Sequence, residues 1–220
     1  MERAPAGVGI VFGVSLAALI VLAGPLLLFN PWTTSALQQR HQVADALGAT
    51  PDQVDRATGA ILADLVTDGS FAVEIDGEPL LNERERSHMH DVAVLVRTLA
   101  AVAILAAVLA AVTGAWLRGE RHRLGRVMVV AAGTVGTLGL LLAGIFAVAF
   151  EPAFLAFHEL FFPPGTYLFE PGSRLITLFP QGFWFEAALL AGIVVVLSAL
   201  AMTLIGLRLW RGGQTTSTPA

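Results

Sequence analysis

Four long apolar runs constrain this chain more than any other feature of its sequence. They cover residues 7–29, 92–117, 127–150 and 183–207. Each is long enough to cross the hydrocarbon core of a bilayer, which takes about 20 helical residues. Backbone groups inside a bilayer must find partners within their own segment, so each run is expected to be a helix. The sequence therefore predicts an all-α membrane protein with four transmembrane helices in a single domain, 1–220.

The composition agrees with this class of protein. The chain is 55% hydrophobic and 14% charged, which is unusual for a soluble domain. The first apolar run is too long for the core of a cleavable signal peptide, so it is interpreted as a signal anchor. The sequence has no cysteine, which excludes disulfides and thiolate metal ligands.

The distribution of arginine predicts how the spans are oriented. The two ends of the chain and the 118–126 loop carry seven arginines and two acids, whereas the remaining segments carry six arginines and 15 acids. The positive-inside rule then places both termini and this loop in the cytoplasm of a plasma membrane protein. Segments 30–91 and 151–182 are expected on the extracytoplasmic side. Their acidic balance argues against a nucleic-acid partner.

The segment 30–91 is predicted to be a small insertion that starts with helices. A weakly amphipathic helix is expected over 33–47. A second helix begins after Thr50, because the side chains of Thr50 and Gln53 have the spacing of a capping box.

A β-hairpin is predicted to complete this insertion. The alternating residues 71–75 are followed by Asp76-Gly77, which is a strong signal for a two-residue turn. The segment 151–182 is rich in proline and glycine and is expected to be mostly irregular. The polar residues 212–220 are expected to form a disordered tail.

Each outer segment places a histidine beside a predicted span. Ser87 is expected to cap the second span, which would put His88 in its first turn, where free N–H groups disfavour an imidazolium. Asp91 lies on the same helix face and is a candidate to orient His88. His158 follows the third span among aromatic residues, with Glu159 beside it.

These histidines allow two interpretations. Taken singly, each is better explained as an interfacial side chain with a solvated tip. Taken together, with carboxylates nearby, they predict a site between helices. The spacing of these groups matches no zinc site, so no metal is expected. No serine is placed as a nucleophile, which argues against a serine hydrolase. No cofactor is expected either.

Four short motifs follow one another along the outer segments. They are Asn82-Glu83-Arg84-Glu85, His88-Met89-x-Asp91-Val92, Phe157-His158-x-x-Phe161-Phe162 and Leu175-Ile176-x-x-Phe179-Pro180-x-x-Phe183. In this order, and with the order of the four spans, the chain resembles the lipoprotein intramolecular transacylase (Lit) family of bacterial integral membrane proteins.

The resemblance implies an outer-facing site with two essential histidines, His88 and His158. It implies that the substrate is a bacterial lipoprotein in a phospholipid membrane. The sn-2 acyl chain of its diacylglyceryl-cysteine would move to the α-amine of that same cysteine and leave a lyso-lipoprotein. The acids near these motifs are candidate supporting residues, namely Glu85, Asp91, Glu159 and Glu186.

This chemistry suits the residues present. Amine and ester belong to one substrate molecule, so the enzyme needs to supply only proximity and proton transfer. Two other functions stay open at this stage, a non-catalytic four-span accessory protein and a metal-dependent membrane lipid hydrolase. The separation of His88 and His158 distinguishes catalysis from the accessory protein. Side-chain nitrogens within about 8 Å of each other, facing a lipid-accessible cavity, would favour catalysis, and histidines pointing to opposite sides would favour the accessory protein.

Overall fold

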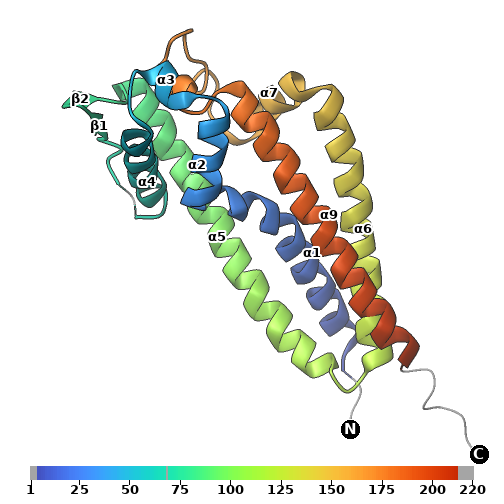
Figure 1. Cartoon of the computed structure of the whole chain (residues 1–220). Helices are drawn as coiled ribbons and strands as arrows, with labels where there is room; N and C mark the ends of the chain where they lie inside the picture. Colours follow the sequence, from blue (N-terminus) through green and yellow to red (C-terminus); the bar gives the residue numbers. More distant parts are fainter. Residues whose placement is uncertain (1–3, 68, 213–220) are drawn as a thin grey trace, which may run out of the picture. The chain divides into compact units, whose positions relative to one another are not determined.

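A computed structural model describes residues 4–67 and 69–212 of the chain, which are mostly helical (Figure 1). The helices are α1 (Ala6–Leu28), α2 (Pro31–Arg40), α3 (Val43–Leu47), α4 (Pro51–Thr67), α5 (Glu83–Leu117), α6 (Arg121–Val148), α7 (Phe150–Phe161), α8 (Arg174–Leu178) and α9 (Gln181–Gly212). Strands β1 (Glu74–Ile75) and β2 (Glu78–Pro79) form one antiparallel hairpin.

Helices α1, α5, α6 and α9 are long and apolar enough to cross a membrane, which confirms the four predicted spans. Their bounds differ from the prediction at polar ends. Helix α5 begins at Glu83 rather than at residue 92, and α9 extends to Gly212. The predicted tail therefore starts inside α9, and its remainder, 213–220, lies outside the described residues.

The early start of α5 has a local cause. The side chain of Asn82 accepts a hydrogen bond from the Glu85 N–H at 3.0 Å, and that of Glu85 accepts one from the Asn82 N–H at 2.8 Å. This reciprocal pair is a capping box. The prediction that Ser87 caps the helix is therefore wrong. His88 lies beyond the first turn, so free N–H groups do not act on it as expected.

The chain divides into two compact units. The first contains the parts of α1, α5, α6 and α9 within Met1–Pro25, Ala100–Ala143 and Ala191–Ala220. The second comprises Leu26–Leu99 and Gly144–Leu190 and holds the other helices, the hairpin and the start of α5. Both candidate histidines belong to the second unit.

Small residues bring α6 and α9 close together in the first unit. A Cβ atom added to Gly125 would lie 2.4 Å from the Trp210 nitrogen and 2.5 Å from the Gly206 carbonyl oxygen. Glycine is therefore required at position 125 unless the backbones move apart. Such small-residue contacts are a common means of packing helices in membranes.

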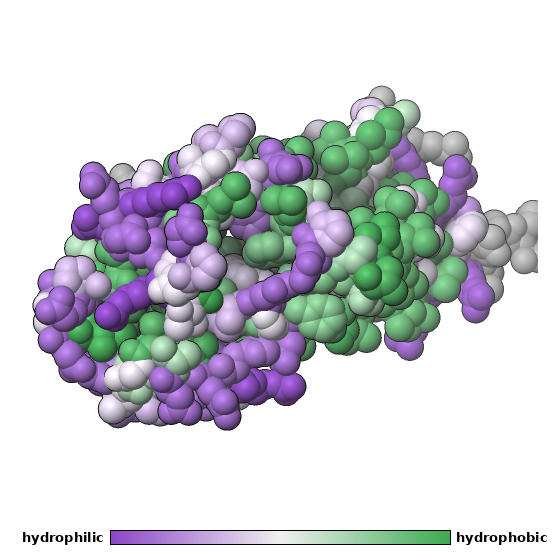
Figure 2. Space-filling model, turned by 90° about the horizontal axis from the view of Figure 1, so that it is seen from above, coloured by the Kyte–Doolittle hydropathy of each residue, from purple (hydrophilic) through white to green (hydrophobic). Residues whose placement is uncertain are grey.

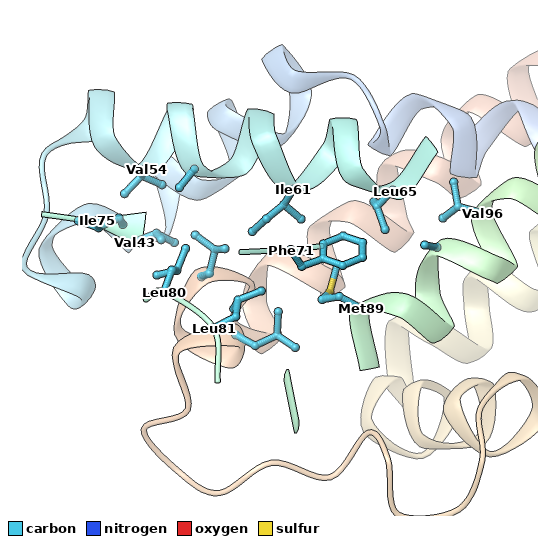
Figure 3. Packing of buried hydrophobic residues seen from close by; sticks show 14 residues of the cluster. Val43, Val54, Ile61, Leu65, Phe71, Ile75, Leu80, Leu81, Met89 and Val96 are labelled. Carbon is cyan, nitrogen blue, oxygen red and sulfur yellow. The ribbon is translucent and has the colours of Figure 1, made fainter. Parts of the chain in front are cut away.

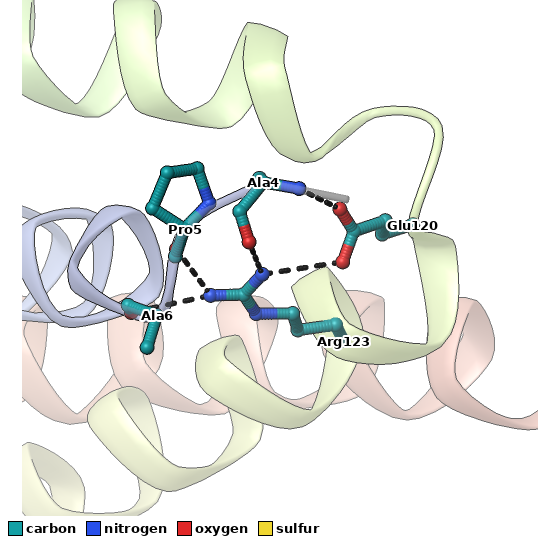
Figure 4. Close-up of polar contacts among 5 residues, drawn as sticks. All are labelled: Ala4, Pro5, Ala6, Glu120 and Arg123. Atoms are coloured by element: carbon teal, nitrogen blue, oxygen red, sulfur yellow. Dashed lines mark hydrogen bonds and ion pairs between the residues drawn. The ribbon is translucent and has the colours of Figure 1, made fainter. Parts of the chain in front are cut away.

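Arg123 connects the start of α1 to the α5–α6 connection in the same unit (Figure 4). Its guanidinium donates hydrogen bonds to the carbonyl oxygens of Ala4, Pro5 and Ala6 and to the Glu120 carboxylate. The other Glu120 oxygen accepts the Ala4 N–H at 2.6 Å. Residues 4–6 thus lie against this connection within the first unit.

The core of the second unit packs α4, the hairpin and α8 around the start of α5 (Figure 3). Phe71 is fully buried, and its ring lies between Ile61 and Met89. Its positive φ of 53° is accompanied by a hydrogen bond from its N–H to the Asp64 carboxylate at 2.8 Å. Because Phe71 leaves the extended conformation, β1 is shorter than the predicted strand.

Two further elements of the second unit differ from prediction. The helix expected over 33–47 is broken into α2 and α3 by Gln42, whose φ of 52° is left-handed. The segment 151–182 is not mostly irregular, since α7 and α8 occupy much of it. Figure 2 shows hydrophilic surface at the left of the view, where α4 and the hairpin lie.

Candidate active site

His88 and His158 lie next to each other in the second unit. Their ring centroids are 6.1 Å apart, and the ring planes are inclined by only 25°. His88 projects from α5 and is 6% exposed, whereas His158 projects from α7 and is partly buried. The structure thus brings together two imidazoles that lie 70 positions apart in the sequence.

Aromatic rings surround this pair. Phe162 and Phe169 contact His88, with centroid distances of 4.9 and 5.5 Å. Phe154 and Tyr167 contact His158 at 4.3 and 5.3 Å. Their apolar faces restrict water around the imidazoles and limit the rotation of both side chains.

A backbone contact determines the tautomer of His158. Its Nδ1 lies 2.8 Å from the Phe154 carbonyl oxygen, which can only accept a hydrogen bond. Nδ1 therefore carries hydrogen, and in the neutral ring Nε2 has the free lone pair. Burial lowers the pKa of His158 from its ordinary value, and the bond to Phe154 opposes this shift. The neutral form, which can accept a proton, is consequently favoured near pH 7.

His88 presents a different feature. Its Nδ1 is buried, and no residue of the described chain hydrogen-bonds to it. Buried polar groups usually have partners, so an unpaired nitrogen beside a second imidazole is an available position for a bound group. His90 projects elsewhere on α5, is exposed and packs edge-on against Phe71 at 5.0 Å.

Of the four acids expected to support the histidines, only Glu85 is fully buried. Its carboxylate accepts hydrogen bonds from the start of α5 and from the start of α8. Asp91 is partly buried, but it makes no hydrogen bond to His88 within the described chain, so the predicted orienting contact is absent there.

The other two acids lie in different surroundings. Glu159 is exposed. Glu186 forms an ion pair with Arg40 at 3.0 Å and approaches His41 at 3.5 Å, so its carboxylate is engaged with the end of α2. Within residues 4–67 and 69–212, no group of three or more potential metal ligands is found.

Sequence reasoning missed the residues that hold the 162–173 loop against His88. Arg84 donates a hydrogen bond to the Gly165 carbonyl oxygen at 2.9 Å and lies 5.9 Å from the Phe169 ring centroid. At the far end of the loop, Ser173 donates its hydroxyl to the Glu85 carboxylate. The Arg84-Glu85 pair was visible as part of a motif, but no sequence signal indicated which loop it would bind.

Comparison with known proteins gives a family and a relative. The family model described as lipoprotein intramolecular transacylase Lit matches residues 10–184. An uncharacterized protein of Aquifex aeolicus (strain VF5) is 27% identical over 134 residues, which are 60% of this chain and 59% of that protein. The chain thus aligns with less than two thirds of this relative's length.

Solved structures with the same fold come from Bacillus cereus. The in meso structure of its membrane integral lipoprotein intramolecular transacylase Lit matches with a TM-score of 0.78 and 19% identity, over 95% of each chain. Two structures of that protein with a histidine-to-arginine or a histidine-to-alanine mutation match with a TM-score of 0.76 and 17% identity. They cover 96% and 94% of this chain, and 93% and 94% of theirs.

Proposed function

This chain belongs to the lipoprotein intramolecular transacylase (Lit) family, and from that membership we propose that it moves the sn-2 acyl chain of a diacylglyceryl-cysteine lipoprotein to that cysteine's own α-amine. The product is an N-acylated lyso-lipoprotein. The observation that carries this proposal is the stacking of His88 on His158 at 6.1 Å within an aromatic enclosure.

The proposed reaction converts an ester and an amine into an amide and an alcohol. The amine nitrogen attacks the sn-2 carbonyl carbon, and a C–N bond forms as the carbonyl oxygen becomes an oxyanion. The bond to the glyceryl oxygen then breaks. The proton lost by the amine is returned to the departing glyceryl oxygen, so the reaction needs no outside reactant and no enzyme nucleophile.

His158 is the proposed general base. Its Nδ1–H is held by the Phe154 carbonyl oxygen, so Nε2 is the nitrogen left to accept the amine proton. The resulting imidazolium is unstable in a partly buried aromatic setting, which favours transfer of the proton onward to the glyceryl oxygen. The same burial keeps the resting base neutral.

His88 is the proposed donor to the oxyanion. Its imidazole is buried next to His158, and its Nδ1 has no hydrogen-bond partner in the described chain. An N–H group fixed in this position stabilises negative charge that develops on the carbonyl oxygen. His88 and His158 therefore act on different atoms of one tetrahedral intermediate.

The proposed site faces the extracytoplasmic side of the plasma membrane, with both termini in the cytoplasm. The arginine-rich 118–126 loop supports this orientation. Apolar side chains of α7 support a position at the membrane surface, since Leu155 and Leu160 are 44% and 76% exposed. A lipoprotein anchored in the surrounding phospholipid would meet the site from this side.

Mass spectrometry of a co-expressed lipoprotein tests the proposal. The wild-type chain is expected to convert the diacylglyceryl form to the N-acyl lyso form, and His88→Ala and His158→Ala are expected to block this conversion. His90→Ala is the matched control, because His90 lies on the same helix but contacts Phe71. Full conversion by either of the first two variants would contradict the proposal.

Purified protein and a synthetic diacylglyceryl lipopeptide distinguish the other functions. A transacylase retains its activity in a strong chelator and releases no free fatty acid. Loss of activity on chelation, with recovery by zinc and free fatty acid as product, would instead indicate a metal-dependent hydrolase. No turnover by a folded wild-type protein would favour the accessory protein.

A further inference from the structure

We propose that Glu85 is a positioning residue for this reaction, because it fastens the 162–173 loop to α5 and thereby sets how His88 faces His158. The inference rests on the proposed function and assigns to Glu85 no contact with substrate. It concerns a buried carboxylate that the proton transfers described above do not use.

The two oxygens of Glu85 have different partners. One accepts the Asn82 N–H at 2.8 Å and completes the capping box of α5. The other accepts the Ser173 hydroxyl and the Leu175 N–H, the latter at 3.0 Å. Glu85 is only 1% exposed, so water does not replace these donors. A single side chain thus joins the start of α5 to the start of α8.

Helix α8 makes this connection rigid. Leu175 and Leu178 are buried in the core of the second unit, so the far end of the 162–173 loop is anchored there. The near end is Phe162, whose N–H bonds to the His158 carbonyl oxygen at 2.9 Å. The loop therefore runs directly from the helix that carries His158 to the residues bound by Glu85.

The same loop supplies the rings that pack on His88, namely Phe162 and Phe169. Glu85 precedes His88 by one helical turn, so both side chains lie on the same side of α5. Movement of α8 away from Glu85 would loosen these rings and the link to His158. Arg84 holds the middle of the loop through Gly165, but it is exposed and its bond is open to water.

Two substitutions at position 85 separate the bonds to α8 from the other properties of the carboxylate. In Glu85→Gln, the amide oxygen can still accept both donors of α8, and only the bond to Asn82 is lost. In Glu85→Ala, all these bonds are lost. Ser173→Ala removes one donor and serves as a milder probe, and Glu83→Gln removes an exposed acid from the same turn.

The expected result is a kcat roughly 100-fold lower for Glu85→Ala with little change in KM, since small misplacements of catalytic groups have effects of this size. Glu85→Gln should retain most of the activity, Ser173→Ala should be intermediate, and Glu83→Gln should match wild type. Equal kcat values for wild type and Glu85→Ala would overturn the proposal. Equal loss in Glu85→Gln and Glu85→Ala would overturn it too, because the charge or the bond to Asn82 would then matter rather than the bonds to α8.

A distance measurement tests the geometry without relying on turnover. Spin labels on Leu168→Cys and Glu78→Cys, introduced into a chain with no native cysteine, report the position of the loop. The distance distribution is expected to broaden in Glu85→Ala and to remain narrow in Glu85→Gln. An unchanged distribution in Glu85→Ala would reject the proposal. An inactive wild type with the expected distributions would instead reject the proposed function alone.

Discussion

Replacing His158 by glutamine should slow acyl transfer by roughly 10²–10⁴-fold, the usual contribution of a general base. Glutamine is polar and can occupy the partly buried position, but its amide cannot accept and release a proton near pH 7. At 1.36 kcal/mol per tenfold change in rate, the loss corresponds to about 2.7–5.4 kcal/mol of transition-state stabilisation. The fixed Nδ1–H of His158 is the structural reason to expect an effect of this size.

The pH dependence of the wild-type rate supplies a sharper test. Burial lowers the pKa of His158 below its ordinary value of 6.5. The ring is therefore mostly neutral above pH 6.5 and becomes protonated only below that pH. The α-amine of the substrate, with a pKa of about 7.7–8.0, must also be deprotonated. The logarithm of kcat/KM should therefore fall with unit slope below the amine pKa and with a steeper slope only below pH 6.5.

Product formation from a synthetic diacylglyceryl lipopeptide can be followed by mass spectrometry across this pH range. The steeper limb should disappear in His158→Gln, while the limb of the amine remains. His90→Gln is the control and should keep the complete wild-type profile. Two results would refute the assignment of His158 as the base. One is a steeper limb that already begins above pH 6.5 in the wild type, and the other is a steeper limb that persists in His158→Gln.

Three further predictions concern folding and orientation. Phe71→Ala should lower the free energy of unfolding by about 3–5 kcal/mol, measured by chemical denaturation, because it empties a fully buried site; an effect as small as that of exposed Val66→Ala would contradict this. Gly125→Ala should cost about 1–3 kcal/mol by overpacking, whereas Gly133→Ala, with open space around the added Cβ, should not lower the thermal unfolding temperature. A cysteine in place of Asp52 should react with an impermeant reagent in intact cells, and labelling only after permeabilisation would reverse the proposed orientation.

The four spans could be predicted because each needs only a sufficiently long apolar segment, which is visible in the sequence of that segment alone. The bounds predicted for their polar ends were less accurate. Asn82 and Glu85 extend α5 beyond its apolar run through a local capping box, and that spacing competed with Ser87 as a cap signal. Helix α7 was missed because the prolines and glycines near it suggested an irregular segment, although they lie mostly after its end.

The sequence by itself determined that the chain is a membrane protein and singled out His88 and His158, since hydropathy and residue type are local properties. Only the tertiary structure decided that Glu85, rather than Asp91, Glu159 or Glu186, binds the loop beside them. That choice depends on the meeting of α5 and α8, whose contacting residues are about 90 positions apart. No local pattern encodes such a contact, because it follows from how the core around Leu175 packs against the start of α5.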